Sequence, residues 1–100
     1  MKKLSLTTVL LFFLSVIISF AQTEEEEESQ INFYDGEFFL AEEDYRDALQ
    51  AFIKVYEAGY QDNANVNYRI GICYLNIPGE KEKSIPYLEK AVSNVSDHYR

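Results

Sequence analysis

The chain has 100 residues and a formal net charge of −8, from 17 acidic and 9 basic side chains. Residues 22–62 carry 13 of the acidic and 2 of the basic residues. Because so acidic a surface repels phosphate backbones, nucleic acid is excluded as a partner. A single cysteine, Cys73, excludes an intrachain disulfide.

Residues 1–21 have the features of a secretory signal peptide. A cationic start at Lys2 and Lys3 precedes an almost wholly apolar run over residues 4–20. Small residues at Ser19 and Ala21 then fit a cleavage site before Gln22. We therefore expect an exported chain, periplasmic or associated with the outer membrane, that is near the membrane but not integral after cleavage. An uncleaved anchor is the alternative, because the apolar run approaches a bilayer-spanning length.

Residues 22–28 are predicted to be an acidic, disordered linker. Glu24 to Glu28 are five consecutive carboxylates without an apolar anchor. Repulsion between like charges at this density extends a chain. The run lacks the alternating ligands and the glycine of a calcium loop, so no calcium site is expected.

Residues 29–62 are predicted to form a helical hairpin, with Ser29 as the N-cap of its first helix. Apolar residues recur three and four positions apart in both halves, which indicates two amphipathic helices. In the first half they are Ile31, Tyr34, Phe38 and Ala41; in the second they are Tyr45, Ala48, Leu49, Phe52, Val55 and Tyr56. Gly59 is expected to end the second helix.

Residues 63–97 are predicted to form a second hairpin, capped by Asp62-Asn63 and turned at Pro78-Gly79. Its two apolar sets are Val66, Ile70, Cys73, Tyr74 and Ile77, and then Ile85, Leu88, Ala91, Val92 and Val95. Pro86 requires that the last helix begin only a few residues earlier. Residues 98–100 are expected to be a tail. Without alternation of period two anywhere, the predicted class is all-α.

The two hairpins are copies of one unit. Gly36 and Gly71 are 35 residues apart, and the apolar residues of the second helices recur after 36. A glycine inside a helix costs about 1 kcal/mol relative to alanine, so each glycine indicates the close approach of another helix. The residues expected to pack the repeats are Gly36, Phe39, Ala48, Phe52, Gly71, Tyr74, Ser84, Leu88 and Ala91.

The spacing Gly36-x-x-Phe39 … Asp44-Tyr45-x-x-Ala48-x-x-x-Phe52 resembles the tetratricopeptide repeat. The second copy, Ile70-Gly71-x-x-Tyr74 … Ser84-x-x-x-Leu88-x-x-Ala91, is similar to it. The resemblance covers residues 29–97 and implies an α-solenoid of two tandem helix-turn-helix hairpins. Asp35 departs from the family pattern, which has a large residue before the glycine.

A narrower resemblance rests on the segment Asn65-Val66-Asn67-Tyr68-Arg69-Ile70-Gly71-Ile72-Cys73-Tyr74-Leu75-Asn76, followed by Pro78-Gly79-Glu80-Lys81. It is similar to the N-terminal repeat region of Gram-negative envelope proteins that combine tetratricopeptide, β-propeller-like and OmpA-like domains. That resemblance implies further repeats or domains in cis, and a setting in an outer-membrane or secretion-linked assembly.

In the tetratricopeptide family the first helices line a concave face that binds extended peptides or partner helices. The resemblance therefore implies a partner-binding groove, whose candidate residues are Gln30, Phe33, Glu37, Leu40, Asn65, Tyr68, Arg69, Ile72 and Asn76. Phe33 and Tyr68 stand where chaperone-type repeats carry carboxylate-clamping side chains, so a terminal carboxylate is not the expected ligand. Alternatively, these two aromatic residues pack against a neighbouring repeat.

No catalytic constellation can be assembled from the sequence. His98 is the only histidine and lies two residues from the end, where a base is poorly positioned. It is also 25 residues from Cys73, which is not a metal-ligand spacing. Without a glycine-rich phosphate loop, no cofactor is expected either.

The sequence therefore predicts a non-enzymatic scaffold of the periplasm or cell envelope that binds a protein partner, whose identity the residues do not specify. The alternative is a structural segment, at the N-terminus of a larger envelope protein, that stabilises or oligomerises it and has no ligand of its own.

Overall fold

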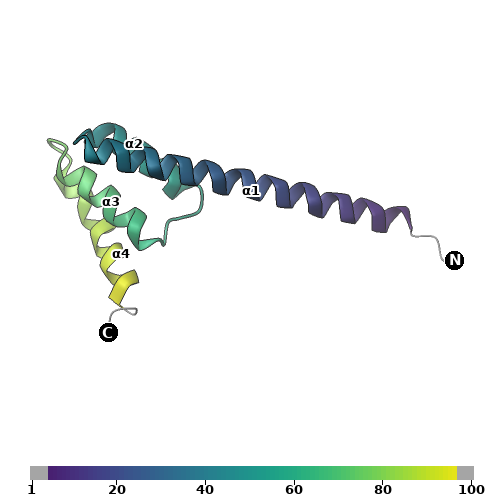
Figure 1. The fold of residues 1–100 in the computed structure, drawn as a ribbon. Coiled ribbons are helices and arrows are strands. Elements are labelled where there is room, and N and C mark those ends of the chain that lie inside the picture. The colour runs from purple at the N-terminus through teal and green to yellow at the C-terminus, as the bar shows by residue number, and fades with distance from the viewer. Residues whose placement is uncertain (1–4, 97–100) are drawn as a thin grey trace.

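The computed structural model describes residues 5–96, which are helical and contain no strand (Figure 1). The helices are α1 at Leu6–Ala41, α2 at Tyr45–Glu57, α3 at Ala64–Leu75 and α4 at Ser84–Ser96, with a 3-10 turn, η1, at Lys81–Lys83. Helix α1 packs on α2, α3 packs on α4, and α2 also packs against α3. The all-α class is therefore confirmed, and the chain forms two successive helical hairpins.

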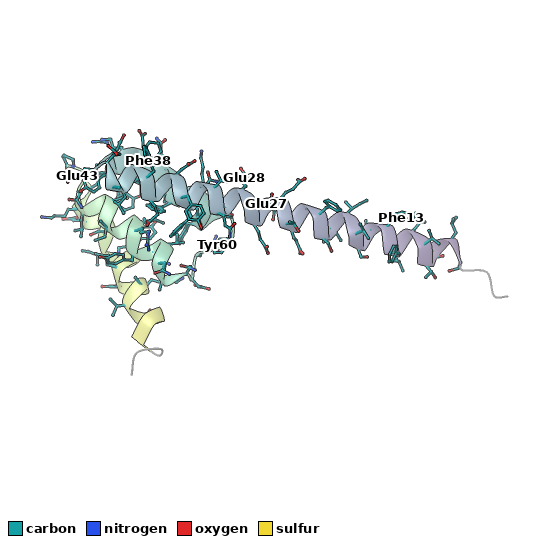
Figure 2. All side chains as sticks on the ribbon, in the orientation of Figure 1. Phe13, Glu27, Glu28, Phe38, Glu43 and Tyr60 are labelled. Carbon is teal, nitrogen blue, oxygen red and sulfur yellow. The ribbon has the colours of Figure 1, made fainter. Side chains whose placement is uncertain are left out.

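The N-terminal half of α1 projects away from the other helices (Figure 1). Its apolar side chains, Phe13 among them, are exposed (Figure 2). This helix is long and apolar enough to cross a membrane, with a mean hydropathy of 2.0 in its most apolar stretch. A signal sequence and a membrane anchor both fit this description, which is compatible with export.

The acidic segment 22–28 is helical, in contrast to the expected disordered linker, and Ser29 is buried inside α1 instead of capping it. Glu27 and Glu28 lie on the uninterrupted helix (Figure 2). Like-charge pairs three or four residues apart cost only about 0.2–0.5 kcal/mol each, and glutamate is a good helix former. Because stopping and restarting a helix requires a new nucleus, the repulsion is too weak to break α1.

The apolar stripe expected to face the core on α1 faces outward instead. Ile31 and Phe38 are 60% and 62% exposed, and Tyr34 and Ala41 are exposed as well. The buried face carries Ser29 and Gly36, flanked by half-buried residues that include Phe33, Phe39 and Leu40. Apolar residues occupy two faces of this helix, and α2 covers the face on which the glycine lies.

In each hairpin, one glycine lets the two helices approach closely. A Cβ atom on Gly36 would lie 2.6 Å from Cε1 of Phe52, and one on Gly71 would lie 2.6 Å from Cγ of Leu88. Phe52 and Leu88 therefore occupy matching places in the two hairpins. Around them Ala48, Ser84 and Ala91 are buried, and Phe39 and Tyr74 are half-buried.

The helix ends follow local sequence signals. The Asn63 side chain accepts a hydrogen bond from Val66 N at 3.1 Å, which caps α3. Gly59 and Gly79 have φ angles of 115° and 80°, as a helix terminus and a tight turn require. Pro86 lies in the first turn of α4, where its missing N–H leaves no helical hydrogen bond unmade. The expected tail at residues 98–100 lies outside the described residues.

We expect Gly36→Ala to destabilise the protein, although helix propensity alone would favour alanine by about 1 kcal/mol. The added methyl would overlap the fully buried ring of Phe52, and overpacking of this kind costs about 1–3 kcal/mol. Gly71→Ala should cost less, because the half-buried side chain of Leu88 can turn away. Urea unfolding of the two variants measures this order, and stabilisation by Gly36→Ala would contradict the contact.

The thiol of Cys73 should be almost inert in the folded protein. Burial raises its pKa to about 11, so far less thiolate is present at pH 8 than for an ordinary thiol with a pKa of about 8.5. Reaction with a chromogenic disulfide reagent should be at least about 100-fold slower than in urea. Since the folded-state pKa is the higher one, this group's contribution to stability is present below about pH 8.5 and is lost as the pH rises above it.

Candidate functional site

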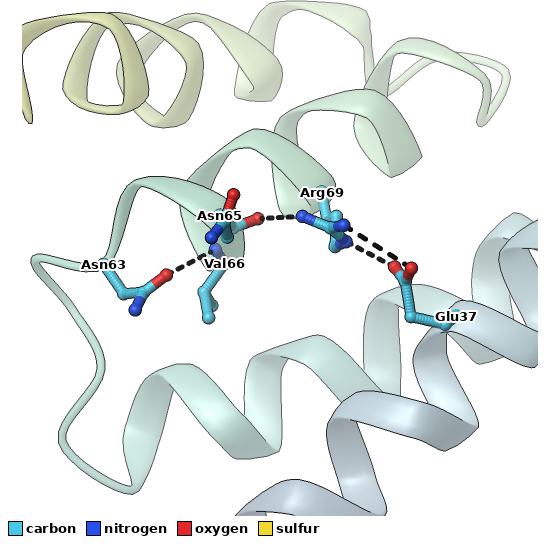
Figure 3. A network of polar contacts seen from close by, with 5 residues as sticks. All are labelled: Glu37, Asn63, Asn65, Val66 and Arg69. Atoms are coloured by element: carbon cyan, nitrogen blue, oxygen red, sulfur yellow. Dashed lines mark hydrogen bonds and ion pairs between the residues drawn. The ribbon is translucent and has the colours of Figure 1, made fainter. Parts of the chain in front are cut away.

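Four of the predicted groove residues meet where α3 faces α1. Arg69 donates from Nε and Nη2 to the two carboxylate oxygens of Glu37, the second at 3.4 Å (Figure 3). Its Nη1 donates to the carbonyl oxygen of Asn65 at 3.1 Å. The guanidinium carbon also lies 4.9 Å from the ring centroid of Phe33. Arg69 therefore ties the second hairpin to the first.

Helical spacing explains this arrangement. Phe33 and Glu37 are four residues apart on α1, and Asn65 and Arg69 are four apart on α3, so each pair shares one face of its helix. The ring of Phe33 also meets that of Phe52 edge-on, with 5.6 Å between centroids. Phe33 is thus a packing residue between the core and Arg69 of the second hairpin.

The ion pair changes the electrostatics of the proposed groove. The side chains of Arg69 and Glu37 are 24% and 38% exposed, so the pair is only partly shielded from water. Pairs of this kind contribute at most about 1 kcal/mol, and the stacking on Phe33 adds a similar amount. Because Glu37 neutralises Arg69, the guanidinium is not a free cation for a ligand.

The remaining candidates are distributed unevenly. Tyr68 is 53% exposed, whereas its repeat equivalent Phe33 is covered by Arg69. Exposed amides lie at both ends of α3, at Asn65 in its first turn and at its C-cap Asn76, whose Nδ2 donates to Ile72 O at 2.8 Å. Leu40 and Ile72 are half-buried, and Gln30 is exposed. The accessible part of this surface is therefore aromatic and amide-bearing, and it lies mostly on α3.

The structural role of Asn67 was not predicted from the sequence. Asn67 is buried, and its Nδ2 donates to the carbonyl oxygens of Gln61 and Asn63 at 2.8 Å each. These bonds fix the α2–α3 loop and hence the position of α3. A signal was present, since Asn32 occupies the same repeat position 35 residues earlier.

A cluster of three tyrosines also joins the hairpins. The ring of Tyr87 on α4 lies 5.7 Å from that of Tyr56 on α2 and 5.7 Å from that of Tyr74 on α3, centroid to centroid. Burial and these two neighbours raise the pKa of Tyr87. The cluster packs α4 against α2 as well as against α3.

Two hollows lie away from the predicted groove. One, of about 590 Å³, separates α1 from the end of α2, and its lining includes Glu25, Glu28 and Glu57. Another, of about 300 Å³, lies between α2 and the turn at η1, where Arg46 and Lys83 are found. Within residues 5–96 no cluster of three or more histidine, cysteine or acidic side chains could hold a metal ion. His98 lies outside the described residues.

Neither a protein-family model, nor a curated protein, nor a solved structure gives a match to this chain.

We expect Arg69→Ala to cost more stability than Glu37→Gln. The glutamine variant loses only a partly exposed ion pair, worth at most about 1 kcal/mol. The alanine variant loses in addition the packing on Phe33 and the bond to Asn65 O. Urea unfolding at low and high salt separates the two effects, since salt screens the ion pair but not the stacking. Equal costs for both variants would contradict the stacking contribution.

Proposed function

We propose that this chain is a non-enzymatic scaffold of the cell envelope that binds a protein partner through the tetratricopeptide-type surface of α1 and α3. The supporting observation is the neutralised, partly open face of α3. Exposed Tyr68 lies there beside the amide of Asn65, and Arg69 is held by Glu37.

This chemistry suits an uncharged stretch of extended polypeptide. Amide side chains offer both donors and acceptors, so they can hydrogen-bond to a peptide main chain. An exposed tyrosine adds a large contact area with little loss of conformational freedom. A ligand recognised by its carboxylate would need a free cation here, and Glu37 occupies Arg69. The partner is therefore read by shape and main-chain hydrogen bonds more than by charge.

Export to the periplasm or outer membrane forms part of the proposal. The apolar N-terminal part of α1 supports it, because a signal sequence also has an apolar stretch near the N-terminus. After cleavage before Gln22, the acidic segment would begin the mature chain. Its glutamates would then lie in the first turns of the helix, where acidic side chains are stabilising.

A second function, the stabilising or oligomerising segment, is favoured by a separate observation. Apolar side chains are exposed on the outer face of α4, at Ile85 and Val92. Faces of this kind suit packing against further helices. The two functions use different surfaces and can be tested apart.

Tyr68→Ala should reduce partner capture at least about fivefold, since tyrosines at the centre of an interface commonly contribute more than 1 kcal/mol. A photo-crosslinking residue at position 65 of the full chain, in the cells that produce it, reports capture as a shifted band. The matched control is Tyr34→Ala, because that tyrosine is also exposed but lies on the outward stripe of α1. Equal capture by wild type and Tyr68→Ala, or equal loss in both variants, would disprove the groove.

A further inference from the structure

The outer face of α4 is exposed, whereas the equivalent face of α2 in the first hairpin is covered. Leu49 and Tyr56 on α2 are half-buried, and the ring of Tyr56 meets that of Tyr87 in the second hairpin edge-on. Their repeat equivalents, 36 residues later, are Ile85 and Val92, which are 53% and 70% exposed. Two positions of the same unit are therefore covered in one copy and open in the next.

Helix α3 shows what covers this face in the first hairpin. Val66, Ile70 and Cys73, at positions i, i+4 and i+7, are at most 2% exposed. They belong to the buried cluster against which the two α2 side chains pack. Arg69, at i+3, lies over Phe33 at the edge of the same interface. The covering element is thus an amphipathic helix with three apolar positions and one cation.

We propose that Ile85 and Val92 on α4, together with Tyr68 at the edge, form a docking face for one helix of a further hairpin. That helix carries apolar residues at i, i+4 and i+7 and a lysine or arginine at i+3, which lies over Tyr68 as Arg69 lies over Phe33. The argument is continuity with the interface already present between the two hairpins. It does not rest on the proposed groove, because Ile85 and Val92 lie outside the groove residues.

A second copy of this chain is not the occupant. Among the helices of residues 5–96, α1 is the repeat counterpart of α3, and its Ile31, Tyr34 and Phe38 correspond to Val66, Arg69 and Cys73. Asp35 stands there in place of Ile70, the residue buried at the centre of the covered interface. Burying an unpaired carboxylate at that point is strongly unfavourable, and no cation lies at i+3. Asp35 therefore prevents the chain from stacking on itself.

Replacing Asp35 by an apolar residue tests the docking face, because self-association of the variant can be measured as a change in mass. In Asp35→Ile, α1 gains the apolar pattern of α3, so copies should associate head to tail and their mass should rise with concentration. The full chain in mild detergent, which covers the apolar N-terminal helix, is suited to sedimentation velocity. We expect at least about tenfold tighter self-association for Asp35→Ile than for wild type, which should stay monomeric. Adding Val92→Asp should return the mass to that of wild type.

Glu57→Ile is the matched control, since it makes the same exchange of acid for isoleucine at an exposed position of α2 outside both faces. It should remain monomeric. The proposal is overturned if Asp35→Ile stays monomeric, or if its association survives Val92→Asp. Wild-type association that Val92→Asp abolishes would also overturn it, because a second copy would then be the occupant. Loss of capture by Tyr68→Ala at the groove is a separate readout.

Discussion

The packing of Phe52 against the backbone of Gly36 decides how this chain folds, and Leu88 repeats it against Gly71. A glycine inside a helix sacrifices about 1 kcal/mol of helix propensity. Full burial of a phenylalanine side chain contributes about 1.5–3 kcal/mol, so the exchange favours close approach of the two helices. Because α2 must meet α1 at the glycine, the contact also decides which face of α1 is buried. The outward direction of Ile31, Tyr34 and Phe38 is a consequence of that choice.

Features set by local chemistry could be predicted from the sequence. The cap at Asn63, the turn at Gly79 and the position of Pro86 all depend on a few neighbouring residues. The helical state of residues 22–28 could not, because it depends on helix on both sides of the acidic run. The buried face of α1 was equally ambiguous, since two apolar stripes run along it and periodicity does not rank them.

In the candidate site, too, some features could be predicted from the sequence and others could not. Spacing along each helix was enough to nominate Phe33, Glu37, Asn65 and Arg69. It could not reveal that the acid and the cation, 32 residues apart, neutralise each other across the hairpins. That pairing is a tertiary fact, and it removes the one cation that the surface could have offered to a ligand. What remains accessible on α3 is the tyrosine and the amides, which favours a partner recognised through its main chain.

The contrast between the covered face of α2 and the exposed outer face of α4 has an energetic reason. In a stack of helical hairpins, stability is approximately a sum of unit terms and nearest-neighbour interface terms. Two hairpins have one such interface, made here by the α3 cluster, the Tyr56–Tyr87 contact and the Arg69–Glu37 pair. A third hairpin on Ile85 and Val92 would add a second interface without disturbing the first. Asp35 restricts that growth to the α4 end, because the same addition on α1 would bury its carboxylate.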